Sequence, residues 1–128
     1  MSDSHLPFWP SYAPSHLWVP QTSLYYNLEV SAARYPDKPF IVFYDTQISY
    51  RRFKDETEKV AGWLQQACGV KKGDRVLVYA QNSPQFMIAF YGILRAGAVV
   101  VPVNPMNLTG ELRHYVHDSG AKVAFAAQ

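Results

Sequence analysis

The 128-residue chain is long enough to form one domain with a core of its own, and its net charge is only +2. Lysine and arginine are scattered apart from Arg51-Arg52 and Lys71-Lys72, so no basic stripe for nucleic acid is expected. The single cysteine, Cys68, excludes an internal disulfide and any metal site built from several cysteines.

The composition also bears on the surface and on the compartment of the protein. Charged residues make up 17% of the chain, against roughly 25% in typical soluble domains. Two readings stay open: apolar surface that meets another part of the same protein, or a well-packed domain with an uncharged polar surface. No stretch reaches the roughly 18 apolar residues of a membrane span, and the N-terminus has no continuous apolar run like a secretory signal. We therefore expect a cytoplasmic protein.

Residues 1–21 are expected to form an extended arm. Prolines at positions 7, 10, 14 and 20 prevent a regular helix there. The segment also contains four aromatic residues, Phe8, Trp9, Tyr12 and Trp18. Disordered tails are usually poor in aromatic residues, so these side chains favour an ordered arm. We expect this arm to press onto a surface, either its own or a neighbour's, with a disordered tail as the alternative. Residues 22–128 would form the α/β portion.

The first predicted elements are a helix over residues 22–35 and a β-hairpin over 40–49. Thr22 or Ser23 can cap the helix, and Pro36 ends it. Asp45-Thr46 is the expected hairpin turn. The residues that recur at helical spacing predict the buried face of the helix: Leu24, Leu28, Ser31, Ala32 and Tyr35.

A second helix is predicted from the cap at Ser49 to Cys68, with Gly69 as its left-handed terminator. Its solvent-exposed face should carry ion pairs between residues four apart, Arg51 with Asp55 and Arg52 with Glu56. Its core stripe is predicted to consist of Phe53, Thr57, Val60, Ala61, Leu64 and Cys68.

From residue 50 onward, predicted helices and strands alternate. Residues 76–80 are apolar without alternation, which is typical of a strand buried on both faces of a parallel sheet. A nearly all-apolar helix follows over 84–96, and its interior Gly92 predicts close packing at that point. Further strands are expected over 98–103 and 122–126, with a helix between them capped by Thr109. The fold class is therefore α/β: a parallel sheet, mixed at one edge by the hairpin, covered by helices.

The usual motifs for chemistry are missing from the sequence. Neither glycine-rich phosphate-binding motif occurs, and residues 71–74 are interpreted as a solvated turn. His114 and His117 have a spacing that suits a metal, but no third ligand is evident, because the other histidines, His5 and His16, lie in the arm. Ser119 and Lys122 match the spacing of acylating serine enzymes, but a strand-opening lysine does not lie one helical turn from the serine. We expect no catalytic, cofactor-binding or metal-binding residue in this chain.

Several segments in order carry a resemblance. Ile48-Ser49-Tyr50 with Phe53, and then residues 94–104, resemble two core motifs of the AMP-forming acyl-CoA synthetases, a superfamily that includes luciferases and peptide-synthetase adenylation domains. The segments 73–76, 82–84 and 118–122 match connectors of that family. The first motif departs at Arg52, where the family has glutamate, so a capping box is lost. The family positions are Ser49, Tyr50, Phe53, Gly73, Asp74, Asn82, Ser83, Pro84, Leu94, Ala96, Gly97 and Pro102.

The resemblance implies a partial N-terminal subdomain of an adenylate-forming fold. The parent enzyme would use ATP, Mg²⁺ and CoA to join a carboxylate, a long- or medium-chain fatty acid, to CoA through an acyl-adenylate. The aromatic and proline-rich arm together with residues 104–109 resembles this branch more than the peptide synthetases. The family's catalytic segments match nothing in this sequence, so the partners of this chain would be the rest of its own polypeptide and the carboxylate substrate. The isolated piece would self-associate through the arm or the apolar helix. The alternatives are a free-standing α/β interaction module that binds a protein partner through its arm and apolar helix, or a flavodoxin-like nucleotide-binding domain.

Overall fold

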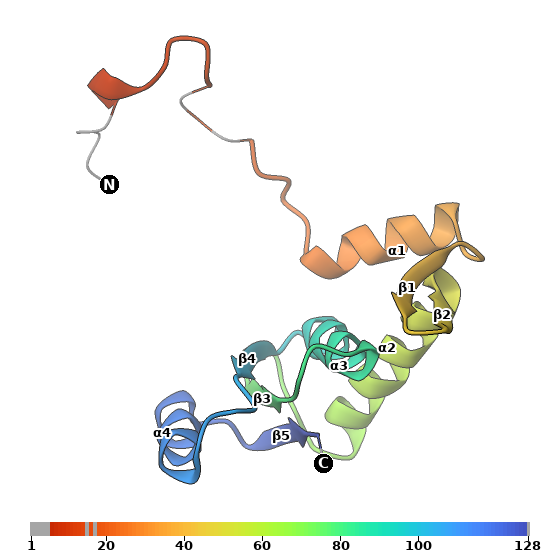
Figure 1. Ribbon diagram of the computed structural model, residues 1–128, viewed down its shortest axis with the longest axis vertical. Coiled ribbons are helices and arrows are strands. Elements are labelled where there is room, and N and C mark those ends of the chain that lie inside the picture. Colours follow the sequence, from red (N-terminus) through yellow and green to blue (C-terminus); the bar gives the residue numbers. More distant parts are fainter. Residues whose placement is uncertain (1–5, 15, 17, 128) are drawn as a thin grey trace.

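The computed structural model describes residues 6–14, 16 and 18–127. Figure 1 shows an elongated body and an N-terminal arm that leads away from it. The elements in chain order are η1 (Leu6–Phe8), α1 (Leu24–Arg34), β1 (Pro39–Phe43), β2 (Thr46–Ser49), α2 (Tyr50–Gln66), β3 (Arg75–Tyr79), α3 (Pro84–Arg95), β4 (Val99–Val103), α4 (Thr109–Ser119) and β5 (Val123–Ala126). Among these helices, none combines the length and the hydrophobicity that crossing a bilayer requires.

The main sheet has the strand order β4-β3-β5, and both pairings are parallel. Its central strand is buried on both faces, with exposed fractions of 0% for Val76 and Val78 and 1% for Leu77. The parallel sheet predicted from the unbroken apolar run is thereby confirmed. The predicted mixing of this sheet at one edge by the hairpin is wrong, because β1 and β2 pair only with each other and form a separate antiparallel sheet.

The two connections of the main sheet run in opposite directions. The chain passes from β3 through α3 to β4, and then from β4 through α4 back across β3 to β5. Because parallel crossovers are right-handed, opposite directions place their helices on opposite faces of the sheet. In Figure 1, α4 lies on the side of the sheet away from α2 and α3.

The core lies between the sheet and the helices α2 and α3. Val76 and Val78 of β3 pack there with Ala61 and Leu64 of α2 and Ile93 of α3. Leu64 and Ile93 are fully buried. Four of the six residues predicted for the buried stripe of α2 are buried: Phe53, Thr57, Ala61 and Leu64. The other two, Val60 and Cys68, are only partly buried, and Cys68 lies beyond the end of the helix.

A second apolar cluster joins the hairpin and α1 to the body, and it contains Tyr25, Leu28, Ile48 and Phe53. The Phe40 ring of β1 contacts Tyr50 and Phe53, with centroid separations of 4.7 and 4.8 Å. The hairpin turn lies at Tyr44-Asp45, one residue before the predicted Asp45-Thr46, and Tyr44 adopts a φ of 50°.

The predicted buried face of α1 is partly wrong. Leu28 and Ala32 are buried as expected, but Leu24 and Tyr35 are 62% and 48% exposed, and Tyr25 is buried instead. Residues 24 and 25 fit the three- and four-residue steps equally well. Contact with α2 decides between them, because the Tyr25 hydroxyl lies 3.2 Å from Thr57 Oγ1.

The predicted ion pairs of α2 are also wrong. Arg51 donates to Asp37 in the turn before β1, at 3.0 Å, and Lys59 donates to Glu56, also at 3.0 Å. Asp37 is brought beside the first turn of α2 by the hairpin, where Arg51 N also donates to Pro36 O at 2.9 Å. The helix ends at Gln66, two residues before the predicted end, and Gly69 is left-handed as expected, with a φ of 65°.

The last two helices differ at their first turns. Ser83 caps α3, accepting a hydrogen bond from Phe86 N at 3.2 Å, and Pro84 follows it in the first turn, as predicted. The N-cap of α4 is Leu108 rather than Thr109, and Leu108 has no side-chain acceptor. Only the reciprocal half of a capping box forms there, with Leu108 N donating to Glu111 Oε2 at 2.9 Å.

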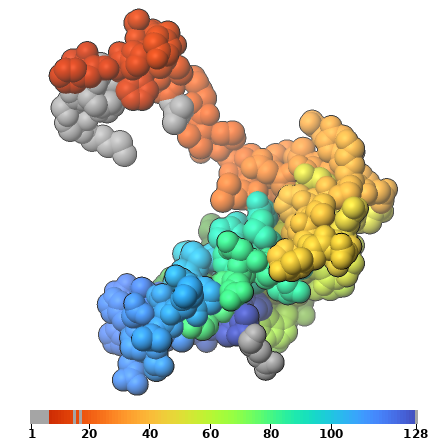
Figure 2. Space-filling view, viewed as in Figure 1, coloured from red at the N-terminus to blue at the C-terminus, as the bar shows by residue number. Residues whose placement is uncertain are grey.

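Three aromatic side chains in the described part of the arm are exposed and do not pack on residues 22–127. Phe8, Tyr12 and Trp18 are 88%, 90% and 99% exposed, and Trp9 Nε1 donates to Ala13 O at 3.1 Å within the arm. The space-filling view shows the arm projecting from the body (Figure 2). Contact of this arm with a neighbouring surface stays a prediction.

Candidate functional site

A crevice opens where β3 and β4 end. The loop after β3 runs to α3 on one face of the sheet, and the loop after β4 runs to α4 on the other. Such a switch in direction leaves room at the carboxyl ends of parallel strands, which is where open α/β sheets bind ligands. The crevice has a volume of about 510 Å³ and is lined by Ala80, Gln81, Asn82, Phe86, Pro102, Val103, Asn104, Pro105 and Met106.

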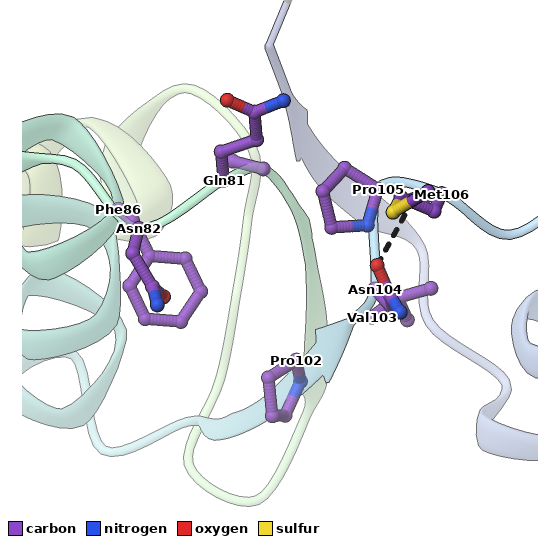
Figure 3. Close-up of a pocket in the computed structure, with 9 residues that line it drawn as sticks. Gln81, Asn82, Phe86, Pro102, Val103, Asn104, Pro105 and Met106 are labelled. Atoms are coloured by element: carbon purple, nitrogen blue, oxygen red, sulfur yellow. Dashed lines mark hydrogen bonds between the residues drawn. The ribbon is translucent and has the colours of Figure 1, made fainter.

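One wall comes from the loop after β3 and the first turn of α3. The Ser83 cap and buried Pro84 fix the start of this helix, so Asn82 and Phe86 hold their places on one side of the crevice (Figure 3). Gln81 lies at the exposed end of the same wall.

The opposite wall is the loop between β4 and α4. Asn104 Oδ1 accepts a hydrogen bond from Met106 N at 3.0 Å, and Asn104 O accepts one from Asn107 N at 3.0 Å. From behind this wall, the Tyr79 hydroxyl donates to Pro105 O and Asn107 O, at 2.8 and 2.9 Å. Pro102 and Val103 at the end of β4 form the floor (Figure 3).

The chemistry of the crevice is neutral. Among the described residues that line it, three side chains carry amides, and the rest are apolar. Amides both donate and accept hydrogen bonds, but they supply neither a general acid or base near neutral pH nor the charge that phosphate groups favour. The crevice is therefore suited to an uncharged part of a ligand and not to bond-making chemistry.

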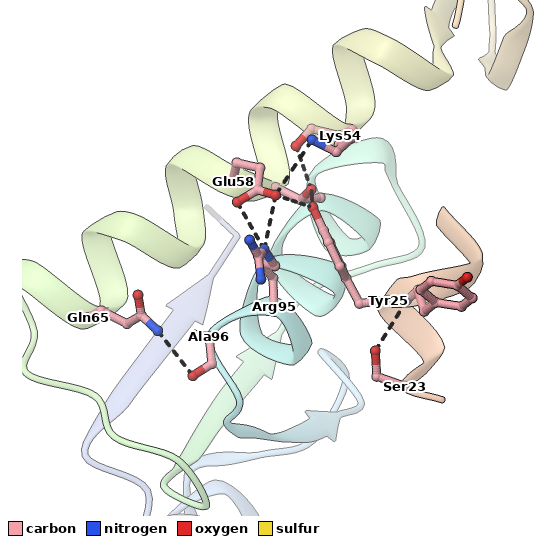
Figure 4. Close-up of polar contacts among 9 residues, drawn as sticks. Ser23, Tyr25, Lys54, Glu58, Gln65, Arg95 and Ala96 are labelled. Atoms are coloured by element: carbon pink, nitrogen blue, oxygen red, sulfur yellow. Dashed lines mark hydrogen bonds and ion pairs between the residues drawn. The ribbon is translucent and has the colours of Figure 1, made fainter. Parts of the chain in front are cut away.

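A polar cluster lies at the other end of α3, where α1, α2 and α3 meet (Figure 4). Arg95 Nε lies 3.0 Å from both carboxylate oxygens of Glu58, and the Tyr25 hydroxyl donates to Glu58 Oε1 at 3.1 Å. Lys54 adds a longer contact to Glu58, at 3.7 Å. The Arg95 guanidinium also lies over the Tyr25 ring, 5.3 Å from its centroid.

The contacts within the cluster shift the pKa values of Tyr25, Glu58 and Arg95. Burial raises the pKa of Tyr25, and the neighbouring Glu58 charge adds to this effect. Burial alone would raise the pKa of Glu58, but its hydrogen bonds from Arg95 and Tyr25 outweigh that effect and hold it below the usual value. The hydrogen bond to Glu58 raises the pKa of Arg95. Since each charged group has its partner, we interpret the cluster as a clamp for α1 and not as a reactive site.

The sequence pattern did not reveal this cluster. Arg95 is 37 residues away from Glu58 in sequence. No local pattern near either residue marks the pair.

The family positions predicted from the sequence mostly join elements of the fold. Gly73 N donates to Gly97 O at 2.9 Å, and Val99 N donates to Asp74 O at 2.8 Å, so two of the predicted motif segments meet at one end of the sheet. Leu94 O accepts from Gly97 N at 3.0 Å, and Ala96 is buried.

The remaining family positions divide between helix starts, the second apolar cluster and the crevice. Ser49 accepts from Arg52 N at 3.3 Å at the start of α2, and Ser83 and Pro84 begin α3. Tyr50 and Phe53 pack in the hairpin cluster. Asn82 and Pro102 line the crevice.

The other sequence candidates lie apart from the crevice lining. Ser119 Oγ donates to Tyr115 O at 2.6 Å at the end of α4, and Lys122 precedes β5. Within the described part of the chain, no group of three or more His, Cys, Asp or Glu side chains is placed to hold a metal ion. His5 lies outside the described residues.

Comparisons with known proteins address the family. Residues 28–128 match the model of the AMP-binding enzyme family. Over 99 residues, which are 77% of this chain, the sequence is 43% identical to a long-chain-fatty-acid–CoA ligase of Escherichia coli O6:H1. It is 38% identical over 115 residues, or 90% of this chain, to a long-chain-fatty-acid–CoA ligase of Bacillus subtilis.

A solved structure gives the corresponding picture of the fold. The inhibitor-bound N-terminal domain of FACL13 from Mycobacterium tuberculosis superimposes with a TM-score of 0.76 at 31% identity, over 81% of this chain and 26% of that one. The chain spans only about a fifth of the curated relatives, 18% of the E. coli ligase and 20% of the B. subtilis ligase. With four-fifths of its residues matched and its fold shared, the chain belongs to the AMP-binding enzyme family.

Proposed function

We propose that this chain is the N-terminal structural part of an ATP-dependent ligase. The ligase would join a long- or medium-chain fatty acid to CoA, first forming an acyl-adenylate and then a thioester. The observation that carries this proposal is the 43% identity to a long-chain-fatty-acid–CoA ligase over 99 residues, 77% of this chain. ATP, Mg²⁺ and CoA would be the cofactors of the whole enzyme, which we place in the cytoplasm.

In this proposal the chain supplies scaffold and not reactive groups. The crevice at the ends of β3 and β4 contains no ionisable lining residue among those described, and the ionic cluster around Glu58 is internally paired. The twelve family positions act as caps, turns and core residues or line the crevice. The partner of this body would be the remainder of the same polypeptide, and the small-molecule partner of the whole enzyme would be the carboxylate.

ATP–pyrophosphate exchange with a fatty acid tests both parts of the proposal. A longer protein that begins with this chain and is as long as its relatives should catalyse the exchange and form acyl-CoA. The 128 residues alone should give the same exchange as a heat-denatured control. Exchange by the chain alone would refute the scaffold role, whereas a longer protein without exchange would refute the ligase assignment.

A second candidate is a free-standing module that binds a protein partner. The observation that favours it is the exposed arm, where Phe8, Tyr12 and Trp18 have no contact with the body (Figure 2). The reading frame past codon 128 discriminates between the two. Continuation into a phosphate-binding segment rich in serine, threonine and glycine supports the ligase, and a stop codon supports the module.

A further inference from the structure

Tyr79 occupies a special position behind the crevice. It is the last residue of β3, the central strand, and its side chain is partly buried. Its hydroxyl reaches two backbone carbonyls of the loop after β4, Pro105 O at 2.8 Å and Asn107 O at 2.9 Å. Tyr79 is not among the residues that line the crevice, so any effect on a ligand must pass through the loop.

The loop wall has few other fixed points. Between Val103 and Thr109 the chain forms no regular element, and Met106 and Leu108 are 82% and 77% exposed. The hydrogen bonds from Met106 N and Asn107 N both end on Asn104, so they shape the loop internally without tying it to the sheet. The Tyr79 hydroxyl supplies that tie. At 2.8–2.9 Å both contacts have the ordinary length of a phenol–carbonyl hydrogen bond, with one proton shared between two acceptors.

We propose that Tyr79 is a positioning residue: it holds the loop wall of the crevice in place and thereby sets the affinity for the substrate whose uncharged part lies there. This inference rests on the proposed ligase function. Holding a binding loop before the ligand arrives lowers the cost of ordering it on binding. Removing the tie should therefore weaken binding of one substrate and leave the chemical step unchanged.

Tyr79→Phe removes one oxygen and keeps the ring, so the fold should persist. Tyr44→Phe is the matched control, because Tyr44 is 88% exposed at the hairpin tip, far from the crevice in sequence and in the fold. In the 128-residue chain, hydrogen exchange at the amides of residues 106 and 107 should accelerate about fivefold in Tyr79→Phe. The amides of β3 serve as an internal reference, and they should exchange as in the wild type. Equal acceleration in β3 would indicate global loosening and refute a local tie.

The functional readout uses the full-length ligase and its three substrates, ATP, palmitate and CoA. In Tyr79→Phe, the KM for one of them should rise about fivefold, while kcat and the other two KM values stay within twofold of the wild type. Tyr44→Phe should match the wild type throughout. Three unchanged KM values, or a loss confined to kcat, would overturn the role of Tyr79. A wild-type protein that forms no thioester would instead refute the proposed function itself.

Discussion

Gly92 of α3 lies directly against Val60 of α2. A Cβ on Gly92 would be 2.5 Å from Val60 Cγ1 and 3.2 Å from the backbone oxygen of Thr57. The sequence predicted close packing at this glycine, and the structure confirms it. The contact brings the two helices together at the middle of the core, where Ala61 and Ile93 are also buried.

We expect Gly92→Ala to destabilise the protein. Alanine favours a helix by about 1 kcal/mol over glycine, but the added carbon must displace Val60 and the α2 backbone. Overpacking of this kind typically costs about 1–3 kcal/mol, so the net change should be a loss of stability. Urea unfolding of the purified chain measures it.

Gly62 provides the control for this prediction. It lies in the same helix as Val60, and a Cβ there would meet nothing within 4 Å. Gly62→Ala should therefore stabilise the protein by up to about 1 kcal/mol. Adding Val60→Ala to Gly92→Ala should recover part of the loss. Equal stabilisation by both glycine replacements would contradict the close contact.

The Glu58 cluster predicts a dependence of stability on pH. The folded-state pKa of Glu58 is lowered, so its contribution is present above the unfolded pKa, near 4.5, and is lost as the pH falls through the folded value. Glu58→Gln should cost about 1 kcal/mol at pH 7, a modest figure because about a third of the side chain is exposed. The difference from the wild type should shrink as the pH falls below 4.5.

Urea unfolding at several pH values tests this prediction, with Glu56→Gln as the control. Glu56 pairs with Lys59 on the exposed side of the same helix. Its replacement should change the free energy of unfolding by less than about 0.5 kcal/mol at pH 7. If Glu58→Gln lowers the free energy of unfolding by the same amount in acid as at pH 7, the carboxylate charge of Glu58 is not the source of the lost stability.

The N-terminus of α4 can be improved by substitution. Its N-cap position holds Leu108, which cannot accept a hydrogen bond and is 77% exposed, while Glu111 already completes the reciprocal contact. Leu108→Ser should complete the capping box and stabilise the protein by about 1 kcal/mol. Thermal unfolding measures the gain. Thr109→Ser, one residue inside the helix, should leave stability nearly unchanged. A gain from Thr109→Ser and none from Leu108→Ser would show that Leu108 is not the N-cap residue.

Self-association through the arm is also expected. The sequence left two candidate surfaces, the arm and the apolar helix α3, but Ala89, Gly92 and Ile93 of α3 are buried in the fold. We therefore assign association to the arm, with its exposed Phe8 and Trp18. Sedimentation velocity should show a larger species as concentration rises, and the double replacement Phe8→Ser and Trp18→Ser should restore the monomer.

Val42→Ser is the comparison for this test, because Val42 is 65% exposed on the hairpin and lies outside the arm. It should leave the concentration dependence as in the wild type. A wild-type chain that sediments as a monomer at every concentration would rule out the arm as a self-association surface.

Much of the fold could be predicted because its signals are local. A serine cap acts on an amide three residues away, as Ser49 and Ser83 do, and a left-handed glycine such as Gly69 ends a helix by its own backbone conformation. The unbroken apolar run of β3 required cover on both faces and hence a parallel sheet. These features follow from residues next to one another, so the sequence was sufficient.

Tertiary structure decided what depends on contacts through space. Leu24 and Tyr25 fit the same helical period, and only docking on Thr57 buried the tyrosine. Arg51 pairs with Asp37 and not with the predicted Asp55, because the hairpin places the Asp37 carboxylate beside Arg51. The crevice and the Tyr79 hydrogen bonds behind it form because the two connections of the main sheet, β3 to β4 and β4 to β5, run in opposite directions. Such pairings depend on distances between segments remote in sequence, and a local pattern carries no information about those distances.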